Sequence, residues 1–387
     1  MLALTATATT ACGDDDKDGK AGGSDAPARI VALWQVKGED PNAIDDYNNG
    51  AVIATERINA AGGVLGKPLQ FERVGSPLTP QAARTAFLQA VDKKPSGIVG
   101  FPGGTEAEGL TRDFDQAKIP IINVNNHVPL AYGQKAGSEW MFSTNPYDVA
   151  TARNMVALAQ KQGWTRLGIL GNDIGYGRDG TDRSKKAAEG TPVTVGTTRL
   201  VPVTATDVTE AVLALKGSQA VLSWTYPNVL AAQLTQMTQN GANAPVVGGG
   251  SVPVVANNKL APPKALDQLY AVLACLPAAA TEGGGKAFND AYKAKYGTPA
   301  PPLAAAAHDA VMMQAEAIRK AGSTTDHTRI RDELAKLSWT GGACQPEYKA
   351  DGSHYLAHQQ VAIKYDQSGV AKIIDTYPIP ALAKGAS

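Results

Sequence analysis

The sequence predicts an α/β protein built from two doubly wound parallel-sheet lobes. The chain has 387 residues, enough for two or three domains at about 150 residues each. Short apolar runs of strand length alternate with segments of helical periodicity, a pattern typical of a parallel sheet covered by helices on both faces. This alternation occurs twice along the chain, so two similar lobes are expected.

The first series of strands and helices ends near residue 124. Gly62-Gly63 stop its first helix, and Thr79-Pro80 provide a cap and a first-turn proline for its second. The strand-like runs are 29–36, 69–74, 97–101 and 119–124, and the helical segments are 47–61, 79–91 and 105–117.

The second series begins at Asn145-Pro146, which open a helix with an apolar stripe. Its strand-like runs are 166–171, 193–203, 219–224, 245–249 and 269–276. Helical patterns follow over 285–296, 303–321 and 327–337, and an alternating strand spans 361–365. Because these helices come after a finished second sheet, we expect the chain to return to the first lobe. The expected lobes are 28–142 plus 278–339, and 143–277 plus 340–380.

Composition excludes several classes of partner. Lys and Arg together number 36 and Asp and Glu also number 36, so no net positive charge favours nucleic acid or an anionic membrane surface. No stretch approaches the roughly 20 apolar residues that span a bilayer as a helix.

Residues 1–27 are expected to be a signal-peptide remnant followed by a disordered tether. The mildly apolar start ends at Cys12, and an acidic, glycine-rich stretch follows. Thr10-Ala11-Cys12 resembles the lipobox of a bacterial lipoprotein, although Thr9 stands where leucine is usual. Either Cys12 carries a lipid anchor or the segment is an ordinary disordered leader.

The other cysteines, Cys275 and Cys344, are too few for a disulfide scaffold and too far apart in sequence for a CxxC redox pair or a zinc knuckle. In an oxidising compartment they are free to form a disulfide. The alternative is two buried thiols.

No motif predicts catalysis, a metal or a cofactor. Gly175 to Gly180 match GxGxxG, but the preceding strand ends too early and the next one offers no acidic residue for a ribose. We interpret this segment as a loop that exposes Tyr176 at a helix start. His354 and His358 lie in an extended pattern, where four residues span about 13 Å, too far to share one ion.

Five loops follow the carboxyl ends of predicted strands, which is where open parallel sheets bind ligands. At one of them, glycines precede Thr105 at a helix start and expose backbone N–H groups. The loops are 101–105, 123–129, 173–177, 224–226 and 248–251.

Four segments carry a resemblance to a known family: 59–67, 119–122, 142–148 and Tyr176-Gly177. Over about residues 29–377 the chain resembles the type I solute-binding proteins of ABC importers, particularly the branched-chain amino-acid and aromatic-acid receptors. The resemblance implies two lobes joined by a three-segment hinge, which close on a small molecule and deliver it to an ABC permease.

The resemblance also implies which residues bind the ligand. The crossovers would lie near 142–145, 275–277 and 339–343, which places the two later cysteines close to the hinge. The expected contacts are Gly104, Thr105, Asn125 and His127 in the first lobe and Tyr176 and Tyr226 in the second, with Phe101, Trp224 and Tyr226 as apolar walls.

One departure from the family bears on the ligand. Amino-acid receptors hold the α-ammonium group with an acidic residue at the position that matches Gly250. Burying an unpaired ammonium costs several kcal/mol, so we expect an aromatic or aliphatic carboxylate that lacks this group, unless Asp173 or Glu39 replaces the acid.

The expected protein is therefore an extracytoplasmic monomeric receptor, in the periplasm or on the outer face of the membrane, and not an enzyme. The alternatives are an amino-acid receptor of the same family, a ligand-sensing module for a chemoreceptor or regulator, and a nucleotide-dependent α/β enzyme.

Overall fold

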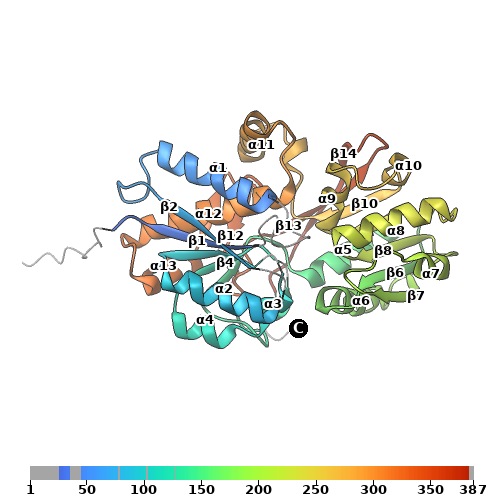
Figure 1. Ribbon diagram of the computed structural model, residues 1–387, viewed down its shortest axis with the longest axis horizontal. Helices are drawn as coiled ribbons and strands as arrows, with labels where there is room; N and C mark the ends of the chain where they lie inside the picture. The colour runs from blue at the N-terminus through green and yellow to red at the C-terminus, as the bar shows by residue number, and fades with distance from the viewer. Residues whose placement is uncertain (1–25, 35–44, 77–78, 102, 126, 383–387) are drawn as a thin grey trace, which may run out of the picture.

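The protein forms two α/β lobes that lie side by side along its long axis (Figure 1). The structure, a computed structural model, describes residues 26–34, 45–76, 79–101, 103–125 and 127–382. Cys12 and Glu39 lie outside these ranges. Each lobe has its own sheet with helices on both faces, which confirms the predicted fold class.

The first lobe contains a five-stranded parallel sheet in the order β2-β1-β3-β4-β5. Its central strands β1 and β3 are apolar and buried except for Arg29 at the start of β1, as a sheet covered on both faces requires. The strands are β1 (Arg29–Trp34), β2 (Gln70–Gly75), β3 (Gly97–Gly100), β4 (Ile121–Asn123) and β5 (Met141–Ser143).

Helices from both ends of the chain cover this sheet. The late helix α12 packs against the early helix α1 and contributes much of the first lobe's core. Figure 1 shows these late, orange helices beside the early blue ones. The helix expected over 105–117 is divided in two by a turn at Gly109 and Leu110. The helices are α1 (Asp46–Ala60), α2 (Pro80–Asp92), α3 (Thr105–Glu108), α4 (Thr111–Ala117), α11 (Gly283–Tyr296), α12 (Pro302–Ala321) and α13 (His327–Ala335).

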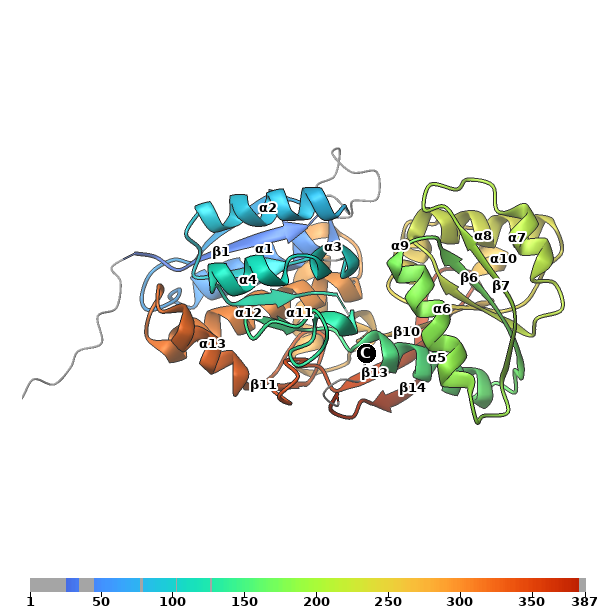
Figure 2. The same cartoon turned by 90° about the horizontal axis from the view of Figure 1, so that it is seen from below.

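The second lobe contains a seven-stranded sheet in the order β14-β13-β10-β9-β8-β6-β7. Five strands are parallel; at one edge β13 pairs antiparallel with β10, and β14 pairs antiparallel with β13 (Figure 2). The strands are β6 (Arg166–Asn172), β7 (Thr194–Val201), β8 (Ala220–Trp224), β9 (Val246–Gly248), β10 (Leu269–Leu273), β13 (Gln359–Tyr365) and β14 (Ala371–Pro378). The helices are α5 (Asp148–Lys161), α6 (Gly175–Ala188), α7 (Thr209–Ala214), α8 (Pro227–Gln239), α9 (Ser251–Asn257) and α10 (Pro263–Leu266).

The chain crosses between the lobes three times. The first crossover joins β5 to α5 and the second follows β10, both near the expected places. The third differs from its expected place at 339–343. Tyr348 and Leu356 belong to the first lobe's core, next to the small sheet of β11 (Ser338–Thr340) and β12 (Glu347–Lys349), so the chain crosses only before β13. Residues 340–357, which the sequence assigned to the second lobe, therefore lie with the first.

A disulfide joins Cys275, just after the second crossover, to Cys344. Both cysteines pack with Ile53 and Phe288 of the first lobe. The fully buried Asp309 holds the same loop, because its carboxylate accepts the N–H groups of Ala343 and Cys344, each at 2.8 Å. In the described part of the chain, no helix has both the length and the apolar character to span a bilayer.

Candidate functional site

A cavity of about 190 Å³ lies between the lobes, at the carboxyl ends of strands from both sheets. Residues at the crossovers also line it, among them Asn145, Ala274 and Gln360. A change in the angle between the lobes would therefore change the cavity directly.

The first lobe's wall is built on the loop after β4. The Asn125 side-chain amide donates a hydrogen bond to the Phe101 carbonyl oxygen at 2.7 Å, and the Asn125 side-chain oxygen accepts the His127 backbone N–H at 3.0 Å. A Cβ atom at Gly104 would lie 2.0 Å from the His127 Cβ. Glycine at 104 thus allows the loop to pack against the start of α3.

The second lobe's wall is aromatic. The Tyr176 ring stacks on Tyr226, with centroids 5.8 Å apart, and meets Trp224 edge-on at 5.5 Å. The Trp224 indole N–H donates to the Ser184 hydroxyl at 2.9 Å, which fixes the innermost ring. These rings form a rigid apolar surface of the kind that binds a flat or branched apolar group.

Most of the residues expected from the sequence line this cavity: Gly104, Asn125, His127, Tyr176, Trp224, Tyr226 and Gly250. Phe101 does not, because its ring packs with Phe87 and Phe114 in the first lobe's core. Its contribution is the carbonyl oxygen that orients Asn125. The Thr105 side chain lies outside what the structure describes, while its backbone begins α3.

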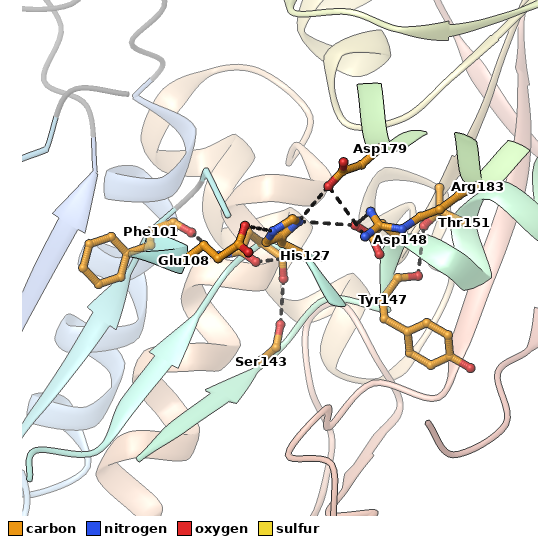
Figure 3. Close-up of polar contacts among 10 residues, drawn as sticks. Phe101, Glu108, His127, Ser143, Tyr147, Asp148, Thr151, Asp179 and Arg183 are labelled. Atoms are coloured by element: carbon orange, nitrogen blue, oxygen red, sulfur yellow. Dashed lines mark hydrogen bonds and ion pairs between the residues drawn. The ribbon is translucent and has the colours of Figure 1, made fainter. Parts of the chain in front are cut away.

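Charged side chains from both lobes meet around His127 and Asp148, which line the cavity (Figure 3). His127 Nε2 lies 3.1 Å from a Glu108 oxygen, and His127 Nδ1 lies 3.6 Å from Asp148 Oδ2 and 3.8 Å from Asp179 Oδ2. Arg183 forms an ion pair with Asp148 and reaches Asp179 at 3.6 Å.

The pKa of His127 reflects this setting. Burial alone would lower the pKa, but the nearby negative charge of Asp148 and the hydrogen bond to the Glu108 carboxylate outweigh it and leave the pKa above its ordinary value. The imidazolium form of His127 is therefore favoured at the junction of the lobes.

Several lining residues were not expected from the sequence. Tyr47, in the first turn of α1, stacks on Trp34 with centroids 5.9 Å apart and lines the cavity. It follows the carboxyl end of β1, so the rule that selected the other loops also indicates this one. Asp148 lies in the segment 142–148 that carried the resemblance. Leu303 and Gln360 come from distant parts of the chain and left no local signal.

Gly177 and Gly180 of the GxGxxG match allow close helix packing. A Cβ atom at Gly177 would lie 2.0 Å from the Asn172 carbonyl oxygen, and one at Gly180 would lie 2.1 Å from the Trp224 ring. The pattern thus lets α6 approach β6 and β8 closely.

The two C-terminal histidines do not form a metal site. The His354 ring stacks on Phe142 with centroids 4.1 Å apart, and burial lowers its pKa to about 4. His358 Nε2 hydrogen-bonds the Lys349 carbonyl oxygen at 2.6 Å. Within the described ranges, no group of three or more His, Cys, Asp or Glu side chains is placed to hold a metal ion.

Comparison with known proteins supports this organisation. The sequence model of a family described as "Periplasmic binding protein" matches residues 27–369. "Leu/Ile/Val-binding protein homolog 8" from Brucella suis is 25% identical over 321 residues, 77% of this chain and 74% of that protein.

Two solved structures share the fold. A solute binding protein from R. palustris in complex with benzoate has a TM-score of 0.82 and 14% identity, covering 94% of this chain and 99% of that one. A leucine binding protein from Thermotoga maritima has a TM-score of 0.80 and 18% identity, covering 91% and 99%.

Proposed function

The chain belongs to the periplasmic binding protein family, and from that premise we propose that it is an ABC-importer receptor whose cleft captures a small organic acid lacking an α-ammonium group. The observation that carries this proposal is that the described lining residues include no carboxylate without an ion-pair partner. Gly250 has no side chain at the position where the resemblance places the acid of the family's amino-acid receptors. Asp148, the one carboxylate among the described lining residues, is already paired with Arg183.

The groups that face the cavity suit an acid held by neutral donors. The described lining residues include no lysine or arginine. Burial raises the pKa of the Tyr47 and Tyr176 hydroxyls above their ordinary value, so both stay protonated and able to donate. Backbone N–H groups at Gly104 and at Gly250 add further donors near the cavity.

The cavity's size and walls favour one ring or one short branched chain. A cavity of about 150 Å³ is large enough for benzene, and the cavity here measures about 190 Å³. Space remains for one acid group beyond a single ring. The R. palustris receptor, which was solved with benzoate, shows that this fold accepts such a ligand.

The names of the curated relatives support a second candidate, an amino-acid receptor. Calorimetry separates the two: benzoate or cyclohexanecarboxylate should bind, and leucine and valine should bind at least a hundredfold more weakly. Tight leucine binding without benzoate binding would reject the organic-acid proposal and favour the amino-acid receptor. Stabilisation by NAD or another nucleotide in a thermal-shift assay would favour an enzyme instead.

We propose further that the receptor is a monomer, that it acts outside the cytoplasm, and that Cys12 carries a lipid anchor. Size-exclusion chromatography tests the first statement. Mass spectrometry of the protein isolated from membranes of an expressing bacterium tests the last, because diacylglycerol on Cys12 adds a characteristic mass that Cys12→Ser removes.

A further inference from the structure

We propose that Asp148 is a positioning residue that holds His127 across the cleft, so that the charge on His127 sets how strongly the lobes close on a ligand. The inference rests on the proposed function, because it concerns the closure of the same cleft. It adds a coupling between pH and capture that the resemblance to receptors does not imply.

The contact joins the two lobes. His127 lies on the loop after β4 in the first lobe, and Asp148 is the first residue of α5 in the second. Their side chains are only 7% and 6% exposed, and their nearest polar atoms are 3.6 Å apart. A second carboxylate from the second lobe, Asp179 on α6, lies 3.8 Å from the same ring nitrogen.

Arg183 fixes these two carboxylates relative to each other. Its guanidinium pairs with Asp148 and lies 3.6 Å from Asp179. All three residues belong to the second lobe, so this arrangement does not depend on closure. The contacts that Asp148 and Asp179 make with His127 do depend on closure, because they cross the cleft (Figure 3).

The charged groups around His127 carry an excess of negative charge, which favours a proton on the imidazole ring. The groups facing it are Glu106 and Glu108 from α3, Asp148 from α5, and Asp179 and Arg183 from α6. Glu106 is buried, and burial raises its pKa, which favours its neutral form. The other three carboxylates face one guanidinium, so a proton on His127 reduces the excess negative charge.

The direction in which pH changes the stability of the closed form follows from comparing the His127 pKa in the open and closed forms. When the cleft opens, the second-lobe carboxylates move away and His127 keeps only those of α3, so its pKa falls. The stabilisation of the closed form is fully present below the ordinary histidine pKa of about 6.5 and is lost as the pH rises through the higher closed-form value. A carboxylate ligand with an ordinary pKa near 4 stays ionised throughout this range.

The first test is made on the protein saturated with benzoate, because the contacts between His127 and the second lobe depend on closure. NMR titration of the imidazole C–H signals in the full chain, with His127→Gln to identify the signal, should give a His127 midpoint above 6.5. Asp148→Asn should lower this midpoint by about one unit, and Asp179→Asn, which removes a more distant and more exposed carboxylate, should lower it less. A wild-type midpoint at or below 6.5, or one unchanged in Asp148→Asn, would overturn the proposal.

The second test follows capture. Benzoate affinity should fall about tenfold between pH 6 and pH 9 in the wild type and stay nearly constant in Asp148→Asn and His127→Gln. Melting curves show whether each variant is folded, and Asp179→Asn provides a second variant if Asp148→Asn is not. Binding with a flat wild-type profile contradicts this inference alone. Complete failure of benzoate to bind counts against the proposed function, and the NMR comparison is then made with leucine, the ligand of the second candidate.

Discussion

Replacing Gly250 by aspartate should convert the cleft from an organic-acid site toward an amino-acid site. The structure accommodates the change. Gly250 has φ −58° and ψ −20°, which any residue adopts, and among the described residues a Cβ atom there would meet Leu303 Cδ2 alone, at an ordinary contact distance of 3.6 Å. Gly250 is also the N-cap residue of α9, where aspartate is among the preferred residues. The substitution should therefore leave the free energy of unfolding unchanged or slightly higher.

The expected gain in affinity follows from the charge pair that Gly250→Asp creates. A hydrogen bond between charged groups contributes about 1.5–3 kcal/mol net in a protein. At 1.4 kcal/mol per factor of ten, leucine should bind about 10- to 100-fold more tightly to Gly250→Asp than to the wild type. Benzoate should bind more weakly, because its carboxylate would then share the cavity with a like charge.

Calorimetry with leucine and benzoate on three proteins measures these effects. Gly250→Asn is the matched control, since it has nearly the same size and shape as aspartate without the charge. If the aspartate and asparagine variants gain leucine affinity equally, size or rigidity rather than charge explains the change. If the wild type already binds leucine as tightly as Gly250→Asp, the missing acid at 250 does not determine ligand class.

Three further changes test the cleft and the fold. Tyr226→Ala should weaken ligand binding by at least 1 kcal/mol in calorimetry while Tyr226→Phe keeps most of the affinity, because Tyr226 stacks on Tyr176 in the cavity wall; unchanged affinity would remove Tyr226 from the site. Reducing the Cys275–Cys344 disulfide, which closes a 69-residue separation, should lower the free energy of unfolding by about 4 kcal/mol in urea titrations. A loss below about 1 kcal/mol would contradict the chain-entropy account. Gly180→Ala should lower the free energy of unfolding by about 1–3 kcal/mol, because the alanine methyl group would overlap the Trp224 ring. This loss should exceed the gain from the better helix propensity of alanine. Equal or higher stability would show that the ring can move.

Local patterns were sufficient to predict the parallel part of both sheets. Buried strands such as Gly97–Gly100 appear in the sequence as continuous apolar runs. Of the two strands at the antiparallel edge, the sequence predicted only β13, which is mostly buried. β14 has no buried residue and lacks a long apolar run. The three-residue strand β5 is too short to stand out from its surroundings.

The site was predictable where it follows from strand ends and unpredictable where it depends on tertiary contacts. His127 and Tyr226 lie in loops that any doubly wound sheet presents to a ligand. The prediction that Phe101 lines the cavity was wrong, because the sequence does not show toward which side an aromatic ring after a strand points. Phe101 has a positive φ of 58°, and its ring lies in the core of the first lobe. The pairing of Asp148 with Arg183 spans 35 positions and two helices, and no local pattern encodes it.

Hydrogen bonds tie the three crossovers to one another. The buried Gln345 amide donates to the carbonyl oxygens of Ala274, at the second crossover, and Gln359, at the third, at 2.6 and 3.2 Å. The first crossover is tied to the third segment through the Leu356 N–H and the Ser143 carbonyl oxygen at 2.9 Å. Because these bonds link the crossovers to one another, bending can change the angle between the lobes without breaking them. The contacts that must form and break on closure are then those across the cavity, which is where the ligand and the His127–Asp148 contact lie.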